Sequence, residues 1–505
     1  MEVQTSNKML IKNSLFLYFR MFFTILVSVY TSRVILQVLG IEDYGLYNVV
    51  GGVIVMFSFM NMSMTTATSR YLNYELGLKI SSTDSLRRVF STCLAVHLTD
   101  ALIVLVLCET AGLYLLYNSM QIPADRFDAC LVVFHTSLVA LFLGILFTPF
   151  NAAIVAHERM NAFAYISIIE VILKLAIVYL LCVINADRLI VYSWLYLFVS
   201  ISLSFVYVIY CWRKFPETRK LVKITKDKYI SIFCFGGWNL FGDGAYALFS
   251  NGINILLNMF FGATVNAARG IMVQVNGIAI KFTQSFQTAI NPQIIKSYSS
   301  NNIERMRDLI MLSSRFTMFV LLIIIIPLFA YIDEILVFWL KNVPPYTAIF
   351  VRLMLIISIF DALGNPLTNA VNATGNNKTY QIIIGGSMLM ICPIAYVCLK
   401  FGCQPYVVFI VHLVIGCIAH FLRLIIVRRK IGFHIMTYVL EVMVKNIIIL
   451  FVVLGLFLFF KSHINVLLGI PLLLIITIVC IFFIGLVPRE RNKVLSYTSN
   501  PQLRA

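Results

Sequence analysis

Residues 15–27 read LFLYFRMFFTILV, an apolar run whose one charged residue is Arg20. The run lies inside a longer apolar stretch at 14–37, and about 20 such residues are enough for a helix to cross ~30 Å of hydrocarbon. Similar stretches recur along nearly all of the 505 residues, of which 60% are hydrophobic and 12% charged. Soluble proteins carry about twice that charged share. The sequence therefore predicts an all-α integral membrane protein.

We expect about fourteen transmembrane helices. The polar start of the chain runs directly into the first span, which is too long for a signal-peptide core, so we expect that span to remain as a helix. The predicted spans are 14–37, 45–66, 89–117, 129–156, 163–184, 189–211, 230–258, 265–290, 314–340, 347–373, 380–400, 406–427, 444–460 and 465–486.

The positive charge is distributed unevenly between the connections. The chain has 39 Lys and Arg against 22 Asp and Glu, a formal net charge of +17. Most basic residues outside the spans lie in the even-numbered connections and in both tails, which the positive-inside rule places in the cytoplasm together with both termini. Attraction to the anionic headgroups of membrane lipids accounts for the rest of the excess, so we expect no nucleic-acid partner. The odd-numbered connections contain Arg126, Arg188, Lys341, Lys400 and Lys461.

Enzyme and metal motifs are not found in the sequence. The eleven cysteines lie mostly inside spans and show no CxxC spacing, which argues against metal sites and disulfides. No HExxH, GxSxG or nucleotide-binding motif occurs in a convincing context. We therefore expect no catalytic residue, no metal and no cofactor, and a transport cycle would draw on a Na⁺ or H⁺ gradient, the membrane potential or the substrate.

The two halves of the chain resemble each other. A shift of 222 residues places Gly40 on Gly262, and a shift of 217 places TPFNAAIVA at 148–156 on NPLTNAVNA at 365–373. Six predicted helices separate the copies, so both copies cross the membrane in the same direction. Parallel repeats of this kind occur in transporters, where the substrate site lies between the halves.

The repeat and the polar stretch WRKFPETRKLVKITKDKY at 212–229 suggest a division of the chain. We expect an N-terminal lobe of six spans at 1–211, a cytoplasmic linker at 212–229 and a second six-helix lobe at 230–427. The last two spans and a cytoplasmic tail then occupy 428–505.

Charged residues inside spans are the most informative positions, because a charge in hydrocarbon needs a partner or water. Arg20, Lys281 and Arg352 have no acidic residue nearby in the sequence. We interpret them as lining a cationic cavity, since Arg grips phosphate through paired donors; the alternative is that each bonds helix carbonyls or reaches a headgroup. Glu170 and Lys174 lie one helical turn apart, and we expect them to neutralise each other in a structural role.

The predicted seventh span contains Asp243 within a cluster of glycines, FGGWNLFGDG at 235–244. The cluster predicts a locally unwound helix whose carbonyls, with Asp243 and Asn239, could hold a coupling cation. The alternative is that Asp243 neutralises an arginine of the cavity.

Four segments resemble bacterial polysaccharide-export flippases of the O-antigen type, within the multidrug/oligosaccharidyl-lipid/polysaccharide exporter superfamily. The first half contributes RVILQVLGIEDYGLYNVVG at 33–51 and TSRYLNYELG at 68–77. The second half contributes FGGWNLFGDG and the segment at 266–298 that begins NAARGIMVQVNG.

The resemblance implies two lobes around a central cavity in the bacterial inner membrane. Alternating access there would move an undecaprenyl-pyrophosphate-linked oligosaccharide to the outer leaflet for surface polysaccharide or lipopolysaccharide assembly, alongside a polysaccharide synthesis complex. The cationic cavity of the family corresponds here to Arg20, Arg33, Arg70, Arg269 and Lys281.

Two other functions compete with this interpretation. A multidrug exporter of the same fold would favour intramembrane carboxylates for cationic drugs, whereas the spans here favour Arg. A membrane-embedded polysaccharide polymerase should show a large outer loop or a His/Asp pair at one membrane face, and the sequence contains neither.

Overall fold

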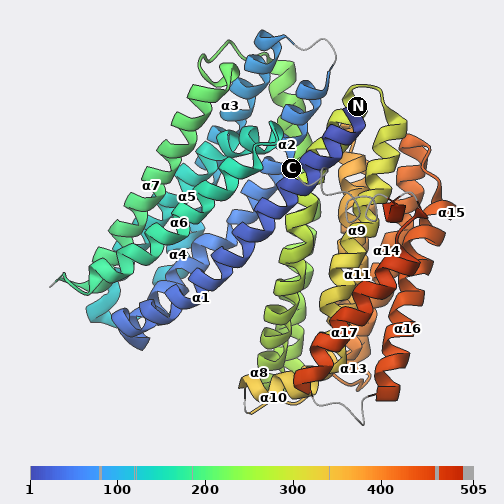
Figure 1. The fold of residues 1–505 in the computed structure, drawn as a ribbon. Helices are drawn as coiled ribbons and strands as arrows, with labels where there is room; N and C mark the ends of the chain where they lie inside the picture. Colours follow the sequence, from blue (N-terminus) through green and yellow to red (C-terminus); the bar gives the residue numbers. More distant parts are fainter. Residues whose placement is uncertain are drawn as a thin grey trace. The chain divides into compact units, whose positions relative to one another are not determined.

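The protein is all-helical in a computed structural model, which describes residues 2–78, 82–118, 120, 122–184, 186–340, 342–460, 466–488 and 490–492 (Figure 1). No strand occurs among these residues. The helices up to residue 299 are α1 (Glu2–Met56), α2 (Ser58–Gly77), α3 (Thr83–Leu107), η1 (Cys108–Gly112), α4 (Leu113–Asn118), η2 (Ala124–Arg126), α5 (Phe127–Ala156), α6 (Met160–Leu181), α7 (Arg188–Lys214), η3 (Pro216–Thr218) and α8 (Lys226–Ser299). The remaining helices are α9 (Ile303–Ala330), α10 (Ile332–Leu340), α11 (Thr347–Ala373), α12 (Lys378–Leu389), α13 (Ile391–Lys400), α14 (Val407–Ile431), α15 (Ile435–Tyr438), η4 (Val439–Val444), α16 (Lys445–Phe460), α17 (Val466–Cys480) and η5 (Ile481–Gly485).

Eleven of the described helices are long and apolar enough to cross a membrane, and the chain is a multi-pass membrane protein. The predicted spans at 230–258 and 265–290 are also helical, and the predicted span at 45–66 is helical except at Phe57, between α1 and α2; none of the three is among the eleven. They are rich in Asn, Ser, Thr and Gly, which lower their apolar character. The all-α membrane fold is therefore confirmed, whereas the number fourteen is not.

Helices α1 and α8 are each broken at a single glycine. Their lengths of 55 and 74 residues far exceed what a membrane needs. The break in α1 is Gly40 (φ 83°, ψ 170°) and the break in α8 is Gly262 (φ 75°, ψ −170°), backbone angles that are essentially restricted to glycine. These are the two glycines that the 222-residue shift pairs, so the repeat extends to the backbone conformation.

The second repeat match also has a structural counterpart. Helices α5 and α11 each contain the paired proline and end at Ala156 and Ala373, which are 217 residues apart. Two residues beyond these ends, Glu158 and Gly375 both have positive φ angles, of 58° and 79°. The same helix end and the same turn therefore occur in both halves. The left-handed conformation is strained at Glu158 and is readily adopted by Gly375.

Two expectations about individual helices are wrong. The predicted ninth span at 314–340 is two helices, because α9 ends at Ala330 and the short helix α10 turns away from it (Figure 1). The glycine cluster at 235–244 does not unwind the seventh span, because α8 is helical there and is interrupted only at Gly262. Glycine is tolerated inside this helix, and the break instead falls at the turn between its two limbs.

The chain forms two compact units. The first comprises 1–247, 288–302 and 372–385, and the second comprises 248–287, 303–371 and 386–505. The division into lobes at 211 and 230 remains a prediction of the topology, since compactness groups residues by contact and not by their order in the repeat.

The first unit is built around α5. Helix α5 packs against α3 and α7, and α1 packs against α6. Its core contains the fully buried Phe90, whose ring meets that of Phe150 edge-on at 5.1 Å. At one end, Arg126 forms ion pairs with Asp43 and Asp187 and so connects α1, η2 and the start of α7. We refer to these three residues as the Arg126 clasp.

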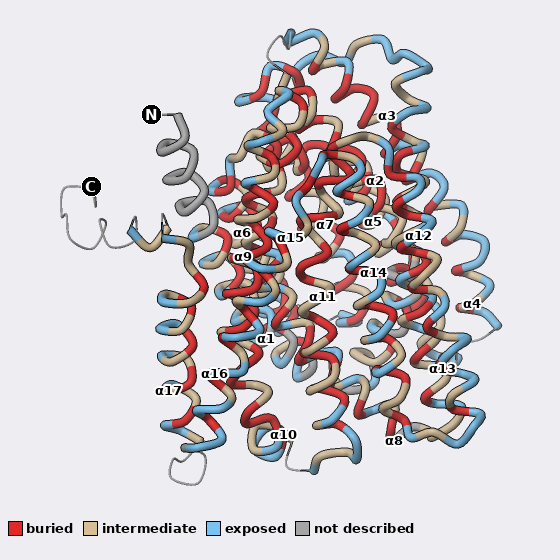
Figure 2. Tube along the Cα trace, turned by 90° about the vertical axis from the view of Figure 1, so that its right-hand side faces the viewer, coloured by how far each residue is buried: buried red, intermediate tan, exposed pale blue. Residues whose placement is uncertain are grey.

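The last two membrane helices belong to the second unit. Helices α16 and α17 share an apolar cluster with α9, and along α17 buried and exposed residues alternate as expected for one packed face and one lipid face (Figure 2). Arg315 of α9 is buried and forms ion pairs with Glu441 and Glu490, at 2.7 and 2.6 Å. The C-terminal helices are thus joined to this unit by both apolar and ionic contacts.

Candidate functional site: a polar cavity inside the first unit

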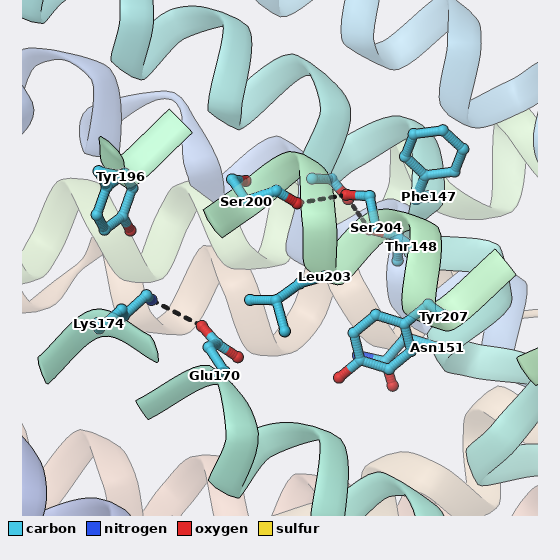
Figure 3. A pocket seen from close by; sticks show the side chains of 11 residues that line it. Phe147, Thr148, Asn151, Glu170, Lys174, Tyr196, Ser200, Leu203, Ser204 and Tyr207 are labelled. Carbon is cyan, nitrogen blue, oxygen red and sulfur yellow. Dashed lines mark hydrogen bonds and ion pairs between the residues drawn. The ribbon is translucent and has the colours of Figure 1, made fainter. Parts of the chain in front are cut away.

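A cavity of about 190 Å³ lies between α5, α6 and α7, inside the first compact unit. Figure 3 shows that side chains from all three helices point into it. Eight of the eleven lining residues carry a polar side-chain group, although the cavity lies among membrane-spanning helices. The lining residues are Gly144, Phe147, Thr148, Asn151, Glu170, Lys174, Tyr196, Ser200, Leu203, Ser204 and Tyr207.

An ion pair forms one wall of the cavity. The Lys174 ammonium donates to Glu170 at 2.7 Å, and it also lies 5.1 Å from the ring centre of Tyr196 (Figure 3). Glu170 follows the start of α6 by about ten residues, or ~15 Å of helix, which corresponds to the middle of a ~30 Å hydrocarbon layer. The expected pairing within the span is therefore present, and the pair also lines a cavity.

Arg20 lies beside this cavity. Its guanidinium carbon is 4.5 Å from the ring centre of Phe163, and it is close enough to Glu170 and Tyr207 to interact with both electrostatically. Its Nε is buried and has no hydrogen-bond partner among the residues that the structure describes. A buried donor without a partner is costly, so this arginine is suited to an additional acceptor.

The other two predicted cavity cations of the first unit have different surroundings. Arg33 is exposed. Arg70 is buried, donates weakly to the carbonyl of Ala373 at 3.4 Å and stacks over the rings of Tyr71 and Tyr74, at 4.4 and 4.6 Å. These contacts give Arg70 a role in joining α2 to the end of α11.

The three predicted cations of the second unit are Arg269, Lys281 and Arg352. Arg269 donates to the backbone carbonyl of Ser250 at 2.6 Å, a residue 19 positions earlier in α8, so the two limbs of α8 fold back on each other around Gly262. Arg352 forms an ion pair with Asp333, and Lys281 is exposed. A shared cationic cavity formed by all six residues stays a prediction.

Asp243 and Asn239 lie one turn apart on α8 and belong to two hydrogen-bond sets. Asp243 accepts a bond of 2.6 Å from Ser63 of α2. The carbonyl oxygen of Asn239 accepts bonds from Asn377 at 2.8 Å and Gln381 at 2.7 Å. Within the described part of the chain, no group of three His, Cys, Asp or Glu side chains could hold a metal ion.

The sequence analysis missed the polar residues of α7. Tyr196, Ser200, Ser204 and Tyr207 recur every three or four positions and therefore share one helix face. This periodicity is present in the sequence, but hydroxyl groups inside an apolar span are common and carry no charge that would draw attention to them. Only the packing of α5 and α6 against this face shows that the four residues surround a cavity.

The fold is that of multi-pass helical transporters. A multidrug resistance MATE family transporter of the MOP superfamily, in an outward-facing conformation, has a TM-score of 0.71 at 12% identity, over 85% of this chain and 96% of that one. A MOP superfamily transporter from Pyrococcus furiosus, described by the reverse polarity of its binding pocket, has a TM-score of 0.69 at 12% identity over the same shares. A MATE structure in the straight conformation has a TM-score of 0.70 at 13% identity, also over 85% and 96%. No protein-family model and no curated protein matches the sequence.

Proposed function

We propose that the protein is an alternating-access flippase of the bacterial inner membrane, with both termini in the cytoplasm. Its substrate would be an oligosaccharide linked through pyrophosphate to undecaprenol, moved to the outer leaflet. The observation that carries the proposal is Arg20, a partly buried arginine about a turn and a half inside the first span, beside a polar cavity, whose Nε has no hydrogen-bond partner among the described residues.

A phosphate-bearing substrate accounts for this arrangement better than a cation does. A guanidinium inside a membrane is retained where it faces an anion or water, and its planar donors match phosphate oxygens. The charged residues inside the predicted spans are mostly basic, which also favours an anionic substrate. In this proposal the exposed Arg33 and Lys281 contribute to attraction of the substrate, and Arg70, Arg269 and Arg352 would exchange their present partners during the cycle.

A multidrug exporter is the second candidate, and one observation favours it. Glu170 lines the cavity and could receive a cationic drug if Lys174 moved away. One similar structure is a multidrug resistance transporter, and another is a transporter whose binding pocket of reverse polarity suggests a different function. The fold therefore suits both classes of substrate, and the charges of the site must discriminate between them.

We further propose that Asp243 links transport to a Na⁺ or H⁺ gradient. Asp243 has one hydrogen bond to a neutral hydroxyl, so a bound cation or proton could compensate its charge. Asn239 would support it through the hydrogen bonds that it accepts from Asn377 and Gln381. Transport by Asp243→Asn that no longer responds to either gradient would agree with this role, and an unchanged response would exclude it.

The decisive experiment measures flipping of a fluorescent undecaprenyl-pyrophosphate oligosaccharide in proteoliposomes. Native protein is compared with Arg20→Ala and with the control Arg87→Ala, whose arginine is in a cytoplasmic pair with Asp84 on α3. We expect native protein and the control to accelerate flipping and Arg20→Ala to lose at least tenfold in rate. Native protein that flips no faster than empty vesicles, but exports ethidium, would replace the proposal with drug export.

A further inference from the structure

We propose that the cavity between α5, α6 and α7 is a binding site for one neutral pyranose ring. The inference deepens the proposed function, and it rests on that function only for the origin of the sugar. A sugar residue of the transported glycan and a free sugar share this chemistry, and the experiment below separates them.

The volume of the cavity selects a small ligand. A volume of about 190 Å³ corresponds to about six water molecules at ~30 Å³ each. Pockets for drug-sized ligands measure roughly 300–1,000 Å³. The cavity is therefore too small for a drug or a polyprenyl chain, but a single sugar ring could replace the water and satisfy the same polar groups.

The charge of the lining favours a neutral ligand. Glu170 and Lys174 are the only charged side chains among the lining residues, and they neutralise each other at 2.7 Å. A bare anion or cation entering the cavity would have to compete with this pair. A neutral polyol can instead donate hydroxyl hydrogens to the carboxylate and accept from the ammonium without separating them.

Polar groups with free hydrogen-bonding capacity lie on two opposite helices. The amide of Asn151 on α5 and the hydroxyl of Ser200 on α7 make no side-chain hydrogen bond to the described part of the chain. The Ser204 hydroxyl donates to the carbonyl of Ser200 at 2.9 Å and the Thr148 hydroxyl to the carbonyl of Gly144 at 2.8 Å, so both keep acceptor capacity. Sugar hydroxyls both donate and accept, which is what this mixture of groups requires.

Aromatic rings complete the site. Phe147, Tyr196 and Tyr207 also line the cavity, and Figure 3 shows Tyr196 near the ion pair and Tyr207 beside Asn151. A pyranose presents C–H groups on its ring faces and hydroxyls around its edge. A cavity with aromatic faces, amide and hydroxyl groups and a balanced ion pair matches both parts of such a ligand.

The test is saturation-transfer NMR on the intact protein in micelles with methyl glucoside and methyl N-acetylglucosaminide. Glucuronate and tetraethylammonium serve as charged probes. We expect saturable binding of at least one neutral sugar in the millimolar range, at least tenfold weaker in Asn151→Leu and in Ser200→Ala. Ser202→Ala is the matched control, since Ser202 is on the same helix outside the lining and bonds Phe198.

Three outcomes overturn the inference: no neutral sugar binds to folded native protein, binding survives in both lining variants, or the organic cation binds instead. Native unfolding temperatures in the variants exclude misfolding as the cause of a loss. Flipping by native protein without sugar binding would remove this inference alone. Sugar binding without flipping would remove the proposed function and leave a site for a free sugar.

Discussion

The strongest test concerns the backbone conformation at Gly40, where helix α1 is broken. Gly40 has φ 83° and ψ 170°, and a Cβ placed there would meet no atom within 4 Å, so its replacement by Ala changes backbone strain without a clash. In such a conformation, a residue other than glycine is strained by about 1–3 kcal/mol. Gly45, only five positions away and also with open space around its Cβ, is inside the helix, where Gly→Ala stabilises by about 0.5–1 kcal/mol.

We therefore expect Gly40→Ala to be less stable than Gly45→Ala by roughly 1.5–4 kcal/mol, the sum of the two effects. The same comparison applies in the second half, where Gly262 is the break and Gly270 is the helical control with open space. Reversible unfolding in mixed micelles, followed by circular dichroism, gives the free energies of all four variants. Equal stability of Gly40→Ala and Gly45→Ala would refute the argument, because it would mean that the chain crosses residue 40 in an ordinary conformation.

Three further predictions concern ion pairs. Lys174→Gln should destabilise the protein by about 2 kcal/mol, a value between those for exposed and buried ion pairs, because both side chains are about one-third exposed. Adding Glu170→Gln should restore most of the lost stability, because it removes the unpaired carboxylate. A double-mutant cycle in micelles measures both effects. Burial alone would raise the pKa of the Asp187 carboxyl, but hydrogen bonds from Arg126 and from backbone amides lower it, so the clasp should stabilise above the ordinary pKa of ~3.9 and weaken as pH falls below that; the melting-temperature gap between native protein and Arg126→Gln should stay constant from pH 7 to about pH 5 and shrink between about pH 5 and about pH 2. Arg315→Met should cost about 3 kcal/mol, because two carboxylates lose their partner, and should increase protease cleavage near the C-terminus.

Each of these predictions has an outcome that contradicts it. A single Lys174 variant as stable as the double variant would mean that the pair contributes nothing. A melting-temperature difference between native protein and Arg126→Gln that stays constant or increases on acidification would show that Asp187 does not contribute to the Arg126 clasp. Unchanged proteolysis in the Arg315 variant would show that apolar packing alone holds the last helices.

The candidate site was predictable only in part. Arg20 and the Glu170–Lys174 pair were singled out because charge inside hydrocarbon is rare and visible in the sequence. The cavity itself was not found, because Asn151 and Ser200 are ordinary residues until neighbouring helices enclose them. The expected unwinding around Asp243 was wrong because a glycine cluster permits a break without requiring one, and the turn at Gly262 already reverses the chain.

The sequence by itself determined the membrane environment, the helical class and the repeat, because apolar length and internal similarity are properties of the linear chain. It also placed the two glycines at which α1 and α8 break at matching positions of the repeat, since only glycine readily adopts their backbone angles. Tertiary structure decided which polar faces meet, that α9 stops at Ala330, and that the ion pair lines a cavity. Those outcomes depend on contacts between helices far apart in sequence, and a local pattern cannot encode which neighbour a helix face will meet.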